Sequence, residues 1–380
     1  MATTLSTSLN DSVNQNYGLG KIISFTRLNL KKTSKEFYLI QTDNCYNYLL
    51  KSLDTELSIS QFIFQEFCLK YIISLSPQFV SRSLETKTGQ LFISHDQKNY
   101  NLRPYFKSYK SIDKTTPNLI SKSGSILAKF HCLSQRIPID VVFNETKAYL
   151  TKFNLTEKND IVSKQLLWTN LVQDYNYNLN QYLDKIKYQQ KIKKSKIDPT
   201  NFITKLKFID TRASQITLSA LNLVKRNNNI FIHGDFHLKN ILKYKQNNND
   251  LKLIDFEFAH LSAPCFDLAY AILMSASNWY LNPLSCDSSL NDKTINNFLY
   301  GYTHYFKSLN KSEVISNIKS QLLIFLKLTT IINLNWCLKE YNTTAIKLAV
   351  NDIQLTQQIS HLCKIFLAID NLEVLPKSWL

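Results

Sequence analysis

Glycine is scarce in this sequence of 380 residues, and its cysteines form no recognisable pair. There are six Gly, and none of the seven Cys has C-x-x-C spacing to another. The wide spacing excludes a zinc ribbon and a dithiol redox motif. An odd number of thiols in a chain of this length is typical of a reduced, intracellular protein.

Long apolar runs are also missing. The most apolar stretch, "LLIFLKLTTIINL", is interrupted by Lys327 and is too short to predict a membrane span. The N-terminal region has no basic residue before Lys21 and no apolar core, so it does not resemble a secretory signal. We therefore expect a soluble, cytoplasmic protein without a membrane partner.

Charge is unbalanced: 45 Lys and Arg against 29 Asp and Glu give a formal charge of +16. Such a charge suits nucleic acid or an anionic ligand such as a nucleotide. Solvated faces rich in scattered lysines explain it better than a functional basic patch does. No nucleic-acid-binding module is evident, so we expect no nucleic-acid partner. Hydrophobic residues at 44% indicate a folded globular protein.

Hydrophobic periodicity divides the chain into three parts. Residues 1–20 are expected to form a flexible N-terminus. Residues 21–106 combine β-prone runs at 21–28, 35–42, 46–52, 78–84, 91–95 and 99–106 with one helical segment at 56–75. Residues 107–380 are mostly helical, with an exposed loop expected at 187–200. The predicted fold class is α+β, with a small β-rich N-terminal lobe and a larger helical C-terminal lobe.

Polar and ionisable residues crowd the stretch "FIHGDFHLKNIL". His233, Asp235 and His237 alternate, and on an extended strand they would face one side as metal ligands. No further His or Cys cluster completes a metal shell, and Gly234 indicates a loop instead.

The spacing to later residues favours phosphoryl transfer. Asn240 follows Asp235 by five residues, and the apolar run "LKLI" leads directly into Asp255. In phosphoryl transfer one carboxylate meets the acceptor hydroxyl, while an amide and a second carboxylate hold Mg²⁺ on the phosphates. We expect the strands at 229–233 and 250–256 to form a hairpin that gathers the three side chains.

The segment "IHGDFHLKNIL…LIDFEFAHLSAPCFDLAYAI" resembles the aminoglycoside phosphotransferase and choline kinase-like family. The family pattern is H-G-D-x-x-x-x-N, an apolar strand ending in D-[FW]-[ED], and D-x-A about ten residues later. The resemblance implies a two-lobed, protein-kinase-like fold. It also implies ATP and Mg²⁺ as cofactors, and a small-molecule hydroxyl as acceptor.

The resemblance assigns a role to each matching residue. Asp235 is expected to be the catalytic aspartate that orients or deprotonates the acceptor hydroxyl. Asn240 and Asp255 are expected to bind the metal and, through it, the nucleotide. Asp267 is expected to brace the catalytic loop through backbone N–H groups, with His233 as a packed, hydrogen-bonded member of that loop.

Upstream, the resemblance places the nucleotide lysine at Lys51. Its expected helix partner is Glu66, with Glu56 as the alternative. The segment "NLRPYF" resembles the link between lobes whose backbone meets adenine. The phosphate loop near "LNLKKTSKEFY" contains no Gly, which is a departure from the family, although Ser34 could offer contacts.

Other polar residues of the motif region receive no chemical role. The family accepts many residue types at His237 and Lys239. His131 is expected in the apolar core of a helix, and His260 at the surface.

The acceptor stays open between an amino alcohol, a homoserine-like molecule, a sugar and an aminoglycoside-like molecule. Asp255 and Asp267 are too close in sequence for a long activation segment, so a protein substrate is not expected. A catalytically inactive pseudokinase that acts as a binding module is the alternative. The aromatic residues that could frame a choline-like cation, or form core instead, are Trp168, Trp279, Tyr280 and Trp336.

Overall fold

The chain forms two compact units, each described by itself below. The computed structural model describes residues 3–28, 35–53, 58–112, 116–155, 174–192, 199–226, 229–246, 250–277, 290–344, 349–376 and 379. The first unit comprises Met1–Ser111, Arg136–Ser163 and Leu242–Glu257, and the second comprises Ile112–Gln135, Lys164–Ile241 and Phe258–Leu380. Because each unit takes in three stretches of sequence, the linear limits 21–106 and 107–380 do not describe these units. As limits of lobes they stay a prediction.

An antiparallel sheet of five strands is the centre of the first unit, in the order β1-β2-β3-β5-β4. Most of the β-prone runs are confirmed as strands, whereas residues 78–84, all described, form only an isolated bridge between Val80 and Leu253. The strands are β1 (Ile22–Arg27), β2 (Phe37–Thr42), β3 (Asn47–Ser52), β4 (Ile93–His95) and β5 (Lys98–Pro104).

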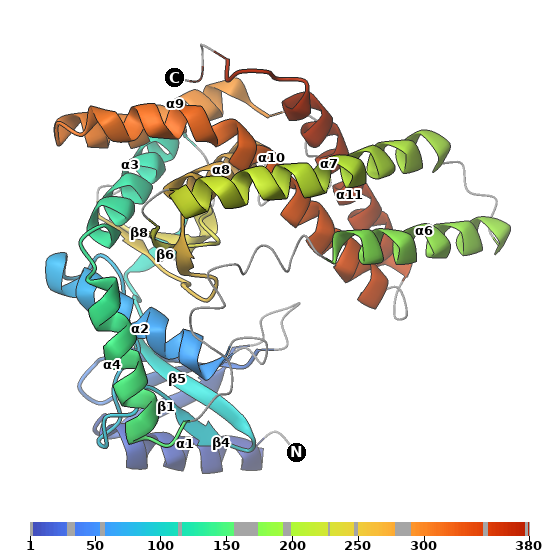
Figure 1. The fold of residues 1–380 in the computed structure, drawn as a ribbon. Coiled ribbons are helices and arrows are strands. Elements are labelled where there is room, and N and C mark those ends of the chain that lie inside the picture. Colours follow the sequence, from blue (N-terminus) through green and yellow to red (C-terminus); the bar gives the residue numbers. More distant parts are fainter. Residues whose placement is uncertain are drawn as a thin grey trace. The chain divides into compact units, whose positions relative to one another are not determined.

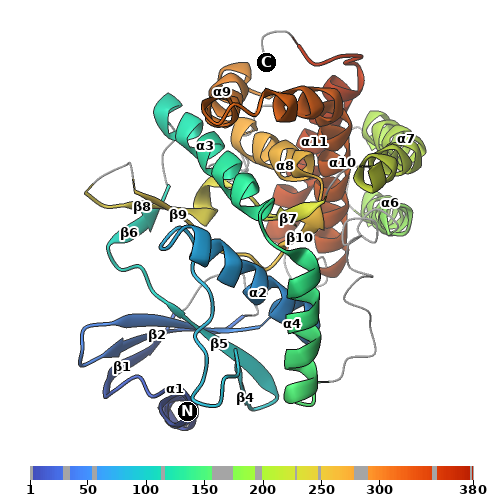
Figure 2. The ribbon, with the colours of Figure 1, turned by 60° about the vertical axis from the view of Figure 1, so that its left-hand side comes forward.

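Alternation along the strands gives this sheet two different faces. Leu50 and Leu102 are fully buried on one face, while their neighbours Lys51 and Arg103 line a cavity on the other. Figures 1 and 2 show α1 (Thr3–Tyr17) on one side of the sheet and α2 (Ile59–Leu75) on the other.

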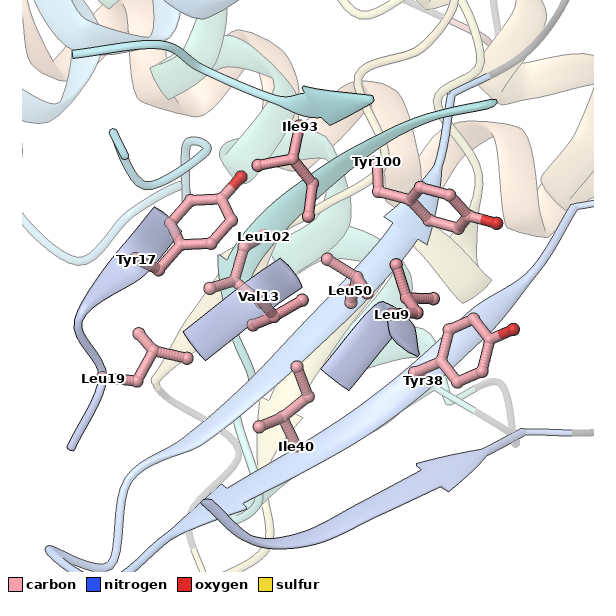
Figure 3. Packing of buried hydrophobic residues seen from close by; sticks show 10 residues of the cluster. All are labelled: Leu9, Val13, Tyr17, Leu19, Tyr38, Ile40, Leu50, Ile93, Tyr100 and Leu102. Carbon is pink, nitrogen blue, oxygen red and sulfur yellow. The ribbon is translucent and has the colours of Figure 1, made fainter. Parts of the chain in front are cut away.

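The N-terminal stretch differs from the expected flexible segment, because residues 3–17 form helix α1. Leu9, Val13 and Tyr17 follow each other at helical spacing and are buried against β2, β3 and β5 (Figure 3). The Ser, Thr and Asn residues between them weaken the apolar pattern, which is why periodicity did not reveal the helix.

Two further elements complete the described part of the first unit. Helix α4 (Ile139–Lys152) packs on α2, where the hydroxyl of Tyr149 accepts the backbone N–H of Leu91 at 2.6 Å. A small sheet has the order β6-β8-β9. Its strands are β6 (Tyr109–Ser111), β8 (Ile241–Tyr244) and β9 (Leu251–Leu253).

The predicted hairpin between 229–233 and 250–256 is wrong. Strand β7 (Ile230–Ile232) pairs with β10 (His260–Ser262) in the second unit, whereas β9 lies beside β8 in the first. Strands β8 and β9 are neighbours instead, and the backbone N–H of Tyr244 donates to the oxygen of Asp250 at 3.0 Å. Strand β7 pairs with a strand that follows the motif.

Helices form most of the second unit. The loop expected at 187–200 is wrong where α6 and α7 extend into it, and residues 193–198 lie outside the described residues. The helices are α3 (Pro117–Ser134), α6 (Tyr175–Ile192), α7 (Pro199–Arg226), α8 (Pro264–Ala276), α9 (Asp292–Ser308), α10 (Ser312–Thr344) and α11 (Ala349–Asp370).

Two of the six glycines lie where α3 and α9 meet. A Cβ on Gly124 would lie 2.0 Å from the backbone oxygen of Phe298, and one on Gly301 would lie 1.8 Å from that of Ser121. The helices therefore approach each other closely at both positions, and the lack of a side chain is what permits it (Figure 2).

Helix α10 is the one helix among the described residues that is long and apolar enough to cross a membrane. However, 72% of its most apolar window is buried inside the protein, where it packs against α6, α7, α8, α9 and α11. Its apolar surface is thus used in the core of the second unit.

Candidate active site

The first unit contains a cavity of about 550 Å³, which is within the range of small-molecule sites. One wall is the sheet face that carries Leu49 and Lys51, and another is the stretch from Ile254 to Glu257. The segment that follows β5 closes a third side. It contributes Tyr105, Phe106, Tyr109 and Lys110.

Lys51 lies at the wall of this cavity between two carboxylates. Its Nζ is 3.0 Å from Oδ1 of Asp255 and 2.7 Å from Oε1 of Glu257. The other carboxylate oxygen of Glu257 forms an ion pair with Lys35. We call Lys35, Lys51, Asp255 and Glu257 the lysine–carboxylate cluster. It brings the predicted nucleotide lysine to the predicted metal ligand Asp255.

Glu66 does not form the pair that the sequence suggested. Its side chain is fully buried, and it accepts hydrogen bonds from the guanidinium of Arg103 and, at 2.6 Å, from the backbone N–H of Ser83. Arg103 also donates to the oxygen of Ser81 at 3.0 Å. The helix carboxylate is therefore satisfied by an arginine of β5, while Lys51 takes its partners from the segment after β9.

Asp255 has an unusual backbone conformation. Its φ is 66°, in the left-handed region that few residues other than Gly adopt and that Asp and Asn tolerate best. Holding a non-glycine residue there costs of order 1 kcal/mol or more, and such residues gather at functional sites.

The motif of the second unit forms a tight loop after β7. Gly234 has a φ of 78°, and a Cβ at this position would lie 2.1 Å from the backbone oxygen of Phe258. The buried carboxylate of Asp267 accepts the backbone N–H of His233 at 2.6 Å and that of Gly234 at 2.7 Å. The hydrogen bonds predicted for Asp267 are thus present.

Asp235 projects from this loop and is held by several donors. The amide nitrogen of Asn240 donates to its Oδ2 at 3.2 Å and to its backbone oxygen at 2.9 Å. The hydroxyl of Tyr270 donates to Oδ1 at 2.7 Å. Nε2 of His237 lies 3.4 Å from Oδ2. Asp235 and Asn240 are therefore brought together, as the spacing suggested.

Sequence reasoning missed Tyr270. The available signal was its spacing of three residues from Asp267 on a helical segment, which places both side chains on one face of α8. That face contacts the loop after β7. Asp267 holds the backbone of the loop, and Tyr270 holds the carboxylate of Asp235.

His131 is buried, as expected, but both of its ring nitrogens form hydrogen bonds. Its Nδ1 and the hydroxyl of Tyr302 are 2.7 Å apart, and its Nε2 is 3.2 Å from Oδ2 of Asp267. Burial favours the neutral form of Asp267, but the hydrogen bond from His131, the charges of His131 and His233, and the N–H of His233 together lower its pKa. Asp267 is therefore a stable acceptor for the loop.

His260, expected at the surface, is buried in β10 and 6% exposed. Its Nδ1 donates to the backbone oxygen of Phe258 at 2.7 Å. Burial lowers its pKa below the ordinary 6.5, against the opposing effects of that hydrogen bond and of Asp267.

The alternating His233, Asp235 and His237 do not converge on a metal-like site. Nδ1 of His233 accepts the backbone N–H of Asp235 at 3.3 Å. Within the described residues no group of three or more His, Cys, Asp or Glu is arranged to hold a metal ion.

The structure describes one of the aromatic residues that could frame a choline-like cation. Trp336 lies on α10 and is 49% exposed. The remaining candidates lie outside the described residues; they are Ser34, Glu56, Trp168, Trp279 and Tyr280.

Comparison with known proteins identifies the fold. Residues 105–283 match the model of the ecdysteroid kinase-like family. An amicoumacin kinase in complex with AMP-PNP and Ca²⁺ superposes with a TM-score of 0.63 at 10% identity, covering 94% of this chain and 92% of that one. The chain has the fold of the small-molecule kinases. No match was found among curated protein sequences.

Two other solved structures with this fold are named as kinases of amino alcohols. A Plasmodium vivax ethanolamine kinase has a TM-score of 0.55 at 15% identity, with 94% of this chain and 85% of that chain covered. A microcompartment-associated aminopropanol kinase has a TM-score of 0.56 at 13% identity, with 96% of each chain covered. The resemblance to the aminoglycoside phosphotransferase and choline kinase-like proteins and the α+β, kinase-like fold class are confirmed.

Proposed function

We propose that this protein is an ATP- and Mg²⁺-dependent phosphotransferase that moves the γ-phosphate to a hydroxyl of a small molecule. The observation that carries the proposal is the 3.0 Å pair of Lys51 and Asp255, which are 204 residues apart. The sequence predicts Lys51 as the nucleotide lysine and Asp255 as a metal ligand. Their meeting at the wall of a nucleotide-sized cavity supports both assignments.

The nucleotide is assigned to the cavity of the first unit. Lys51 supplies a cation for the phosphates, and the backbone of the "NLRPYF" segment, at the end of β5, receives the adenine. The bound AMP-PNP of the amicoumacin kinase supports a nucleotide for this fold.

The metal is assigned to Asn240 and Asp255. Both hydrogen bonds of the Asn240 side chain use its amide nitrogen, so within the described part of the chain the amide oxygen is available as a ligand. Amide and carboxylate oxygens are the hard ligands that Mg²⁺ prefers. When bound, the metal would neutralise charge on the phosphates.

Asp235 is assigned the role of orienting or deprotonating the acceptor hydroxyl. Tyr270 and Asn240 hold its two carboxylate oxygens, which fixes where an acceptor hydroxyl would be oriented or deprotonated. His233 and Asp267 are assigned to the support of this loop. The names of the structural neighbours favour an amino alcohol or an aminoglycoside-like acceptor. The proposal includes a soluble, cytoplasmic protein with no nucleic acid or membrane partner.

The thermal midpoint with and without Mg-ATP tests the nucleotide site. Nucleotide at about a hundred times its Kd adds roughly 2.7 kcal/mol, which raises the midpoint by a few degrees. Asp255→Asn should lose this shift, because Asn keeps the backbone conformation but removes the charge. Asp96→Asn is the matched control, since Asp96 is in the same unit and also has a positive φ, 47°.

ATP consumption over a panel of amino alcohols, sugars and aminoglycosides then tests the reaction, with Asp235→Asn as the inactive variant. No thermal shift in the wild type with ATP or GTP would contradict the proposal and favour the pseudokinase.

A further inference from the structure

Glu257 lies between two lysines at the wall of the nucleotide cavity. Its Oε1 is 2.7 Å from Nζ of Lys51, and its Oε2 forms an ion pair with Lys35. The three side chains are only 14–18% exposed, so their charges are weakly screened by solvent. Lys35 lies just before β2, at the end of the glycine-free stretch that should cover the phosphates.

Lys35 changes the charge of this cluster. Taken as a group of three, Lys51, Asp255 and Glu257 carry a net charge of −1. Adding Lys35 brings the four groups to neutrality. Lys35 therefore lowers the repulsion between these side chains and a polyphosphate, and it offers a second ammonium donor.

Glu257 is itself fixed to helix α2. Its backbone oxygen accepts a 3.0 Å hydrogen bond from Nε2 of Gln65. The neighbouring Glu66 forms an ion pair with Arg103. Helix α2 is therefore linked to Lys51 through Gln65 and Glu257, not through its own carboxylate.

We propose that Lys35 is a second phosphate-binding cation that replaces the backbone contacts of a glycine-rich loop, and that Glu257 is a positioning residue that holds Lys35 beside Lys51. This inference rests on the proposed function. The ligand class is a nucleoside di- or triphosphate.

Titration calorimetry of the full-length protein with Mg-ATP, Mg-ADP and adenosine tests the role of Lys35. Lys35→Met should weaken ATP and ADP about tenfold or more and leave adenosine unchanged, because only the phosphates contact the lysine. Lys35→Arg should keep most of the affinity. Lys98→Met is the matched control, because Lys98 is an exposed ion-paired lysine of the same sheet.

Glu257→Gln distinguishes positioning from simple repulsion. If Glu257 only repelled phosphate, its neutralisation would tighten ATP binding; as a positioning residue its loss should weaken ATP severalfold. Tighter binding would overturn its role. If the wild type binds Mg-ATP and Lys35→Met binds it equally well, the inference fails while the proposed function stands. If the wild type binds no nucleotide, both fail.

Discussion

The hydroxyl of Tyr270 donates a 2.7 Å hydrogen bond to Oδ1 of Asp235, the carboxylate assigned to the acceptor. A hydrogen bond to a charged group contributes about 1.5–3 kcal/mol, mostly through its effect on orientation here. Tyr270→Phe should therefore lower kcat about tenfold and leave KM for ATP unchanged.

Steady-state kinetics with a turned-over acceptor would check this, with Tyr300→Phe as the control on an exposed tyrosine of the same unit. A Tyr270→Phe enzyme with wild-type kcat would show that the hydrogen bond does not orient Asp235 for catalysis.

The buried pair of Arg103 and Glu66 makes a second prediction. Glu66 is 0% exposed, so removing the guanidinium leaves an uncompensated carboxylate in the core. Arg103→Met should lower the free energy of unfolding by about 3 kcal/mol, as broken buried pairs do.

Urea denaturation would measure it, and the double variant Glu66→Gln, Arg103→Met should be less destabilised than the sum of the single variants. Arg82→Met is the control, because its partner Glu85 is 55% exposed. Strict additivity in the double variant would contradict the coupling of the two residues.

Burial of His260 makes stability depend on pH. Its pKa is below 6.5 in the folded protein, so below that pH the unfolded chain binds a proton that the folded chain does not. The contribution of His260 to the free energy of unfolding is therefore fully present above pH 6.5. It decreases as the pH falls, by at most about 1.4 kcal/mol per pH unit. His260→Asn, which keeps a donor for Phe258, should flatten the stability profile between pH 7 and 5. Equal slopes in the two proteins would refute this.

Gly301 tests the close approach of α3 and α9. An alanine Cβ there would lie 1.8 Å from the backbone oxygen of Ser121, so one helix must move. Gly301→Ala should destabilise the protein by about 1–3 kcal/mol, although alanine is the better helix former. A raised thermal midpoint would mean that the contact is not tight.

Some of these residues could be predicted from the sequence, and others could not. The order of Asp235, Asn240, Asp255 and Asp267 revealed the loop, because that chemistry needs fixed residue types at fixed spacing. The β-prone run at 46–52 revealed a strand. The partner of Glu66 was hidden, since helical spacing gives the face of a residue but not which cation of β5 reaches it.

Non-local pairing was equally hidden. Strands β7 and β9 are both short and mainly apolar. Nothing in their local sequences shows that β7 pairs with β10 and that β9 pairs with β8. Tyr270 and Lys35 were overlooked because each acts through a contact with a distant carboxylate and has no motif of its own.

The first unit is assembled from three stretches that end with Leu242–Glu257. During synthesis, Lys51 leaves the ribosome long before Asp255, which follows it by 204 residues. Asp255 and Glu257 pair with Lys51 and form part of one wall of the cavity. They are synthesised only after the helices that precede them, α7 of the second unit included. The first unit therefore cannot be complete before residues 112–135 and 164–241 of the second unit have been made, and no single cut of the polypeptide would release it whole.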